Sequence, residues 1–145
     1  MTVALVCDPM AQKLCWLARQ YAFLCAEEFV ETKHILLAAT EVTPMEWHGY
    51  EQLTIGQLLD AMAGILGVRS DLCECRPCRL APNVVEVLTV AAERASRSGR
   101  AISCQDIWIA LLEEEMGMCS FLIKRLDIDP KELQQRLQRV PPNTA

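Results

Sequence analysis

Apolar residues recur at a helical spacing along most of this chain, and the pattern occurs twice. A first long amphipathic stretch runs from Met10 to Glu28, and a second runs from Asn83 to Ser98. Each is followed by a shorter apolar segment, residues 30–39 in the first case and 102–111 in the second. Apolar positions three and four residues apart are typical of helices that bury one face. The duplication predicts two helical halves that pair around a shared core.

Local signals indicate where the helices begin and end. Asp8 before Pro9 predicts an N-cap followed by the first helical residue, and Pro82 predicts the start of the second long helix. Gly99 is placed to end that helix. No segment has a convincing strand signal, so we expect an all-α fold. Further helix starts are expected at Thr32, Thr54, Ser103 and Asp129, with a break at Gly117.

The chain is long enough for one domain with its own core. Of its 145 residues, 52% are hydrophobic and only 6% are aromatic, so we expect an aliphatic core built from helices. We expect residues 1–145 to form a single domain. The first repeat is expected at about 8–72, a linker at about 73–81, the second repeat at about 82–139 and a disordered tail at 140–145.

Charge and motif content exclude several classes of protein. The formal net charge of −5 argues against nucleic-acid binding, which needs a basic face to neutralise phosphates. The longest apolar runs are too short to cross a membrane, and the N-terminal segment lacks the basic region of a signal peptide. We therefore expect a cytoplasmic protein with reduced thiols and no membrane partner.

The sequence contains no motif for an enzymatic reaction. A Gly-x-x-x-x-Gly-Lys-Ser/Thr phosphate loop is absent, and so is the Gly-x-Ser-x-Gly elbow of many hydrolases. The two histidines are His34 and His48, and a Cys–His catalytic pair cannot be assigned from the sequence. We expect no enzyme activity.

The two repeats resemble the double repeat at the N-terminus of Clp-type AAA+ unfoldases. Residues 10–22, Met-Ala-Gln-Lys-Leu-Cys-Trp-Leu-Ala-Arg-Gln-Tyr-Ala, resemble the first helix of that family, and residues 32–38 resemble its Thr-Glu-His-Leu-Leu-Leu-Ala segment. Gly67-Val68 and Asp127-Ile128 stand where the family has a Gly-Val-Asp turn. The resemblance covers about residues 8–139. It implies two four-helix halves, related by a pseudo-twofold axis, that dock adaptors or substrates for an ATPase ring.

Some relatives recognise phosphorylated arginine in the groove of each repeat. They use a threonine at the start of the first helix and the glutamate of the Thr-Glu-His segment. The corresponding positions are Asp8 and Lys33 in the first repeat, and Ala81 and Gln105 in the second. The carboxylate that would pair with a guanidinium is missing in both copies, and Lys33 would repel it. We expect negligible binding of phosphoarginine.

We expect partner proteins to bind around the helix starts, where unpaired backbone N–H groups favour polar or anionic groups. Residues 44–53 occur in only one repeat and are expected to form a surface loop. Its Trp47, His48 and Tyr50 either flank the binding groove or fold back on the first repeat. The predicted partner-binding residues are Asp8, Lys33, His34, Trp47, Tyr50, Ala81, Gln105 and Asp106.

Three cysteines, Cys73, Cys75 and Cys78, form a Cys-x-Cys-x-x-Cys cluster in the linker. Three thiolates can hold zinc if a fourth ligand comes from elsewhere. A regular structural zinc site would have two paired Cys-x-x-Cys motifs, so a metal site, a redox-responsive pair and thiols without a special role all remain open. We expect no cofactor. The candidates for a fourth ligand are Cys7, Cys104 and His48.

Two functions follow from these observations. The leading one is a protein-interaction module that binds an adaptor, a substrate or another component of a Clp-type chaperone or protease system, without ATPase activity. The alternative is a cytosolic metal- or redox-sensing regulator that uses the Cys73, Cys75 and Cys78 cluster on the same scaffold.

Overall fold

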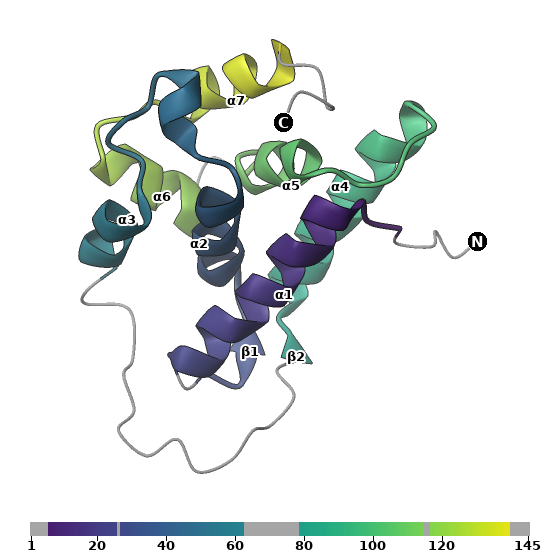
Figure 1. Ribbon diagram of the computed structural model, residues 1–145, viewed down its shortest axis with the longest axis horizontal. Helices are drawn as coiled ribbons and strands as arrows, with labels where there is room; N and C mark the ends of the chain where they lie inside the picture. The colour runs from purple at the N-terminus through teal and green to yellow at the C-terminus, as the bar shows by residue number, and fades with distance from the viewer. Residues whose placement is uncertain (1–5, 26, 63–78, 115–116, 140–145) are drawn as a thin grey trace.

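The computed structural model describes residues 6–25, 27–62, 79–114 and 117–139. Most of these residues are helical, and two very short strands pair between the halves of the chain (Figure 1). The prediction of an all-α fold is confirmed. Among the helices that the structure describes, none is both long and apolar enough to span a bilayer.

The order of elements follows the duplication in the sequence. The first half contains α1 (Pro9–Leu24), β1 (Phe29–Val30), α2 (Thr32–Val42), the 3₁₀-helix η1 (Met45–His48) and α3 (Ile55–Ala61). The second half contains β2 (Arg79–Leu80), α4 (Pro82–Arg97), α5 (Cys104–Leu111), α6 (Met118–Arg125) and α7 (Pro130–Arg139). The second half thus has the four predicted helices. The end of the first predicted half, residues 63–72, lies outside the described residues, as do the linker residues 73–78 and the tail.

Most helix starts lie where the capping signals predict them. Asp8 is the N-cap of α1, and its Oδ1 accepts a hydrogen bond from the Ala11 N–H at 2.8 Å. Gly99 follows the last turn of α4 with φ +64°, the left-handed conformation that glycine adopts without strain. One start differs by a residue. Thr32 is predicted as an N-cap, whereas the N-cap of α2 is Glu31 and Thr32 is the first helical residue.

The strands connect the two halves crosswise. β1 precedes α2 in the first half and pairs in parallel with β2, which precedes α4 in the second half, so that Val30 lies opposite Leu80. An isolated parallel bridge pairs Cys7, before α1, with Ile102, before α5. Val30 and Ile102 occupy equivalent positions in the two repeats, and so do Leu80 and Cys7. The two strand pairings are therefore equivalent contacts, one at each junction between the repeats.

Backbone hydrogen bonds repeat this symmetry. The Ala81 N–H donates to the Val30 carbonyl at 2.9 Å, and the Asp8 N–H donates to the Ile102 carbonyl at 2.9 Å. Equivalent groups thus make equivalent bonds across the interface between the halves, as expected for a pseudo-twofold arrangement. The sequence pattern misses these strands because two residues are too few to show the alternation of a half-buried strand. The end of the predicted linker, residues 79–81, therefore takes part in the backbone hydrogen bonds between the halves.

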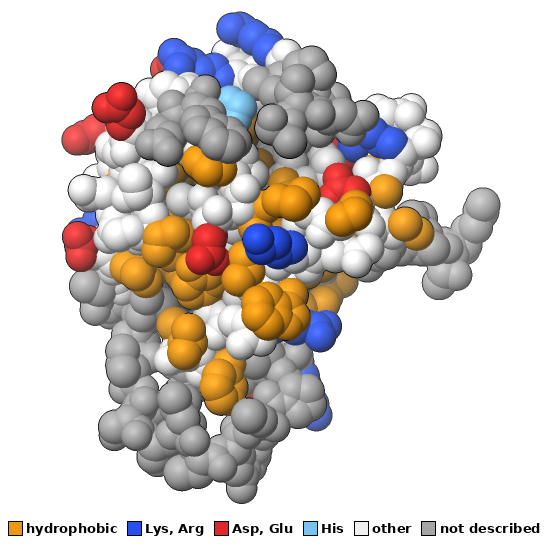
Figure 2. Space-filling model, in the orientation of Figure 1, with side chains coloured by type: hydrophobic (Ala, Val, Ile, Leu, Met, Phe, Trp, Pro, Cys, Tyr) orange, Lys and Arg blue, Asp and Glu red, His pale blue; other side chains and the backbone are white. Residues whose placement is uncertain are grey.

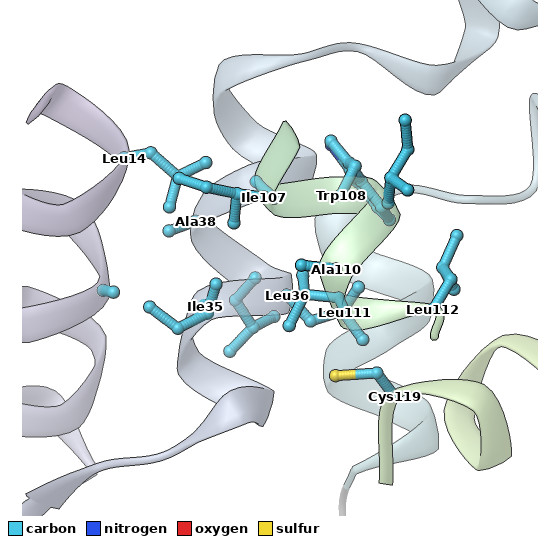
Figure 3. Close-up of a cluster of buried hydrophobic side chains, with 14 of the residues drawn as sticks. Leu14, Ile35, Leu36, Ala38, Ile107, Trp108, Ala110, Leu111, Leu112 and Cys119 are labelled. Carbon is cyan, nitrogen blue, oxygen red and sulfur yellow. The ribbon is translucent and has the colours of Figure 1, made fainter. Parts of the chain in front are cut away.

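The core lies where α2 and α5 meet between the long helices (Figure 3). Leu36 of α2 and Trp108 of α5 hold equivalent positions, and both are fully buried. The indole of Trp108 is larger than the side chain of Leu36. The two halves therefore share a backbone arrangement but fill equivalent positions with side chains of different volume. Leu17 is only partly buried. Leu36, Leu37, Leu88, Ile109 and Leu112 are buried, in keeping with the aliphatic core that the composition predicts.

The predicted surface loop at residues 44–53 is folded into the molecule instead. Met45, Tyr50 and Leu53 are buried, and η1 occupies part of the segment. The apolar side chains of this segment can be buried because α7 of the second repeat packs over the segment. Arg136 of α7 stacks on the Tyr50 ring. The segment therefore also contacts the second repeat, a contact that neither sequence-based alternative, flanking the groove or folding back on the first repeat, includes.

Candidate functional site at the paired helix starts

The crosswise pairing brings helix starts of opposite repeats together at two junctions. In the first, which we call the Asp8–Ser103 junction, the start of α1 lies beside the start of α5. In the second, the Ala81–Glu31 junction, the start of α4 lies beside the start of α2. The sequence predicts partner binding around these helix starts. The structure adds that each junction combines a first helix from one repeat with a second helix from the other.

Asp106 is the buried centre of the Asp8–Ser103 junction. Its Oδ2 accepts hydrogen bonds from the Ser103 N–H at 2.9 Å and from the Ser103 hydroxyl at 3.0 Å, which completes a capping box on α5. Arg100 pairs with both carboxylate oxygens, with Nη2 at 2.8 Å from Oδ1, and Arg94 Nε lies 3.2 Å from Oδ1. Burial opposes ionisation, but the bonds from Arg100 and Ser103 outweigh it and hold the pKa of Asp106 below its ordinary value.

His34 occupies the equivalent position at the Ala81–Glu31 junction. Its Nδ1 accepts a hydrogen bond from the Glu31 N–H at 2.9 Å, and the Glu31 side chain completes a capping box on α2. The proton therefore lies on Nε2, which is 3.4 Å from Glu27 Oε2. Burial, with a smaller effect of Lys33, lowers the pKa of His34 to about 4. A neutral imidazole and a carboxylate thus cap equivalent helices in the two repeats.

Lys33 is held by two carboxylates and does not present a free charge to a groove. Its Nζ lies 2.8 Å from Glu27 Oε1 and 2.9 Å from Glu31 Oε2, and the residue is 7% exposed. Burial would lower the pKa of Lys33, but the bonds to both glutamates raise it above the ordinary value. The ammonium group is consequently neutralised inside the junction, where it joins the segment before α2 to the first turn of that helix.

The other predicted partner-binding residues are also mostly engaged. Ala81 is buried, Asp8 is half-buried as the cap of α1, and the Gln105 side-chain amide donates to the Leu137 carbonyl of α7. The side chain of Trp47 lies outside the described structure. Five of the eight predicted residues are buried, and partner binding by them stays a prediction. They are Lys33, His34, Tyr50, Ala81 and Asp106.

Two open hollows flank Val6 at the Asp8–Ser103 junction. One, of about 470 Å³, lies against α1 and is lined by Val6, Trp16 and Arg19, among other residues. The other, of about 340 Å³, lies against the end of α4. Val6 is 60% exposed and Trp16 is 59% exposed, although both are large and apolar. Apolar side chains gather along the face over α1 (Figure 2). Sequence analysis did not single out Trp16, which could have been found as an aromatic residue on the polar face of an amphipathic helix.

The proposed metal ligands cannot be assembled from the described residues. Cys73, Cys75 and Cys78 lie outside them. Within the described segments, no group of three or more histidine, cysteine or acidic side chains is arranged to hold a metal ion. The candidates for a fourth ligand, Cys7, Cys104 and His48, are each partly exposed.

The fold and the paired junctions together define a two-repeat helical domain in which each half completes the other. The solved structures that share this fold include the following two. The N-terminal domain of the caseinolytic protease associated chaperone ClpD from Arabidopsis thaliana superposes with a TM-score of 0.77 at 18% identity, over 95% of this chain and 95% of that chain. The Hsp104 N-terminal domain from Candida albicans superposes with a TM-score of 0.75 at 14% identity, over 92% of this chain and 90% of that chain.

The chain therefore has the fold of a Clp N-terminal domain, as its sequence pattern suggested. By sequence, no family model and no curated protein matches it. The likeness lies in the arrangement of the backbone, since only 14–18% of the residues are identical.

Proposed function

We propose that this chain is a protein-interaction module that binds adaptors or substrates of a Clp-type chaperone or protease system and has no ATPase activity of its own. The observation that carries the proposal is the superposition of 92–95% of the chain on N-terminal domains of a protease-associated chaperone and of Hsp104. The absence of a phosphate loop from the sequence fits the same role. In this proposal the protein acts in the cytoplasm, and its net charge of −5 disfavours nucleic acid as a partner.

The surface best suited to a partner is the hollow beside α1 together with its exposed rim. Val6 and Trp16 expose more than half of their surface there. Large apolar side chains that remain exposed in a folded protein often mark an interface, and tryptophan is among the residues that contribute most to binding. The buried groups of the Asp8–Ser103 junction support this rim by fixing the starts of α1 and α5. They do not need to touch the partner.

Site-specific photo-crosslinking tests the proposal. A photoreactive residue at Trp16 is expected to capture an adaptor, a client or a ring component of a Clp-type system from an extract of the source cells. The same residue at Glu114, which is exposed beyond α5, serves as the matched control. If the Trp16 probe captures only proteins unrelated to chaperones and proteases, the proposal is wrong.

With a captured partner in hand, binding measurements locate the face. Trp16→Ala is expected to weaken binding about tenfold or more, whereas Glu114→Ala leaves it unchanged. Trp47→Ala tests the flanking contact that the sequence predicts. Lys33→Glu is a poor probe of the surface because it would place a third carboxylate beside Glu27 and Glu31. Equal affinities for the Trp16 and Glu114 variants would place the binding face elsewhere.

A further inference from the structure

A stripe of four residues runs along the outer side of α1. Its members follow one another at spacings of three and four residues, so they share one side of the helix. They are Gln12, Trp16, Arg19 and Phe23, and we call them the Trp16 stripe. The first three line the hollow of about 470 Å³ beside α1, and Phe23 is half-buried one turn further on. Because Trp16 is 59% exposed, the stripe presents a large aromatic surface to solvent.

The charge on α1 is opposite in sign to that of the protein as a whole. The chain has a formal net charge of −5, whereas α1 contains no acidic residue and carries Lys13 and Arg19. Both are exposed, and each lies three residues from Trp16, which makes them its neighbours on the helix surface. The carboxylate of Asp8, before the helix, is used as the cap and accepts the Ala11 N–H. Basic side chains lie among the apolar ones over α1 (Figure 2).

The pseudo-equivalent face of α4 shows that the fold does not require this combination. We compared positions counted from the proline that opens each long helix. The residues that correspond to Lys13, Trp16 and Arg19 are Glu86, Thr89 and Ala92. The first basic residue is thus replaced by an acidic one, the exposed indole by a small hydroxyl side chain, and the second basic residue by a buried alanine. Packing of the repeats therefore does not account for an exposed aromatic group between two cations.

We propose that the Trp16 stripe binds an acidic segment of a partner protein, with an aromatic or large aliphatic side chain of that segment packed on Trp16 in the hollow. Acidic side chains of the segment pair with Lys13 and Arg19. The proposal rests on the proposed function, since it specifies the chemistry of the partner at the surface assigned there. It excludes strongly basic segments, because the two cations repel them.

The two features of the stripe contribute differently. Exposed ion pairs add little binding energy and are screened by salt, so Lys13 and Arg19 mainly select the sign of the partner's charge and speed its association. The indole of Trp16 supplies the apolar area, and the hollow beside it has room for a side chain of the partner. We therefore expect binding that depends strongly on Trp16, moderately on the two cations, and on the salt concentration.

Selection from a random peptide library displayed on phage tests the proposal without knowledge of the natural partner. The full chain is the bait. We expect the enriched peptides to have a net negative charge and to contain at least one aromatic or large aliphatic residue. A dye-labelled synthetic copy of an enriched peptide is then titrated with the protein and followed by fluorescence anisotropy. Its affinity is expected to fall about threefold or more when NaCl is raised from about 0.05 M to about 0.3 M.

Matched variants locate the contact. Trp16→Ala is expected to weaken binding of the enriched peptide about tenfold or more. Lys13→Glu and Arg19→Glu are each expected to weaken it about threefold or more. Lys124→Glu makes the same change of charge on the exposed surface of α6 and should leave the affinity unchanged. Val85→Ala removes an exposed apolar side chain from α4 and should also have no effect.

The proposal is overturned if the selection enriches no peptide, if the enriched peptides are neutral or basic, or if their binding does not depend on Trp16. Neutral or basic peptides that still require Trp16 would overturn the acidic partner and leave the binding surface in place. The proposed function fails separately, when the photoreactive residue at Trp16 captures no component of a Clp-type system.

Discussion

The guanidinium of Arg136 lies over the ring of Tyr50, with Cζ 5.0 Å from the ring centroid. Arg136 also donates from Nη1 to the His48 carbonyl at 3.2 Å, and its Nη2 lies 3.1 Å from Glu132 Oε1 on the same helix. Arg136 belongs to α7 of the second repeat, whereas Tyr50 belongs to the segment that only the first repeat contains. This contact therefore joins the two repeats at a place where they are not symmetric.

We expect Arg136→Ala to lower the free energy of unfolding by about 1 kcal/mol, because both the stacking and the bond to the His48 carbonyl are lost. Tyr50→Phe is the matched control. The Tyr50 hydroxyl has no hydrogen-bond partner within the described residues, and the ring is kept, so we expect a change within about 0.5 kcal/mol. Urea unfolding measures both. Equal effects of the two variants would show that stacking contributes nothing.

The stability of the domain is expected to fall as the pH is lowered from neutral. Burial lowers the pKa of His34 to about 4 in the fold, while an unfolded chain has the ordinary value of about 6.5. Between these values the unfolded state binds more protons, so stability decreases with decreasing pH. The expected loss between about pH 7 and about pH 5 is on the order of 2 kcal/mol.

His34→Asn isolates this contribution. Asparagine keeps an oxygen that can accept the hydrogen bond from the Glu31 N–H, but it does not titrate. Urea unfolding of both proteins across the range should show a flatter dependence for the variant. Asp106 does not contribute in this window because its lowered pKa matters only at more acidic pH. A pH dependence that is unchanged in His34→Asn would contradict the prediction.

Truncation of the shared core tests the pairing of the repeats. Leu37 in α2 and Leu112 at the end of α5 are 0% and 4% exposed. Leu37→Ala and Leu112→Ala are each expected to cost about 2–5 kcal/mol, the usual range for removing a buried leucine side chain. Glu86→Ala, on the exposed face of α4, is the control and should stay within about 0.5 kcal/mol. Losses below that value at both leucines would mean that the shared core is misplaced.

Phosphoarginine is expected to bind negligibly at either junction. The position that would supply a carboxylate is Lys33 in one repeat and Gln105 in the other, and Gln105 is tied to the Leu137 carbonyl. Glu27 and Glu31 are the carboxylates nearest to Lys33, and both already pair with it. Calorimetry with free phosphoarginine and with a phosphoarginine peptide measures this. Low-micromolar binding would overturn the prediction.

The sequence predicts the helices well because their starts are local. The caps at Asp8 and Ser103 act within three residues, and the apolar spacing that follows needs no partner to be recognised. The strands could not be predicted, since each has two residues and exists only through pairing with the other half. The helical pattern alone also does not show which charged side chains form ion pairs inside the protein. Lys33 looks like a surface charge until Glu27 is placed beside it by the turn after α1.

The crosswise bridges have a consequence for how the chain acquires its structure during synthesis. α1 and α2 are close in sequence and can pack soon after they leave the ribosome. The segment before α1, however, finds its hydrogen-bonding partner at Ile102, and β1 finds its own at Leu80. The first repeat therefore keeps two strand edges unpaired until first Leu80 and then Ile102 have emerged. Neither half completes its backbone hydrogen bonds alone.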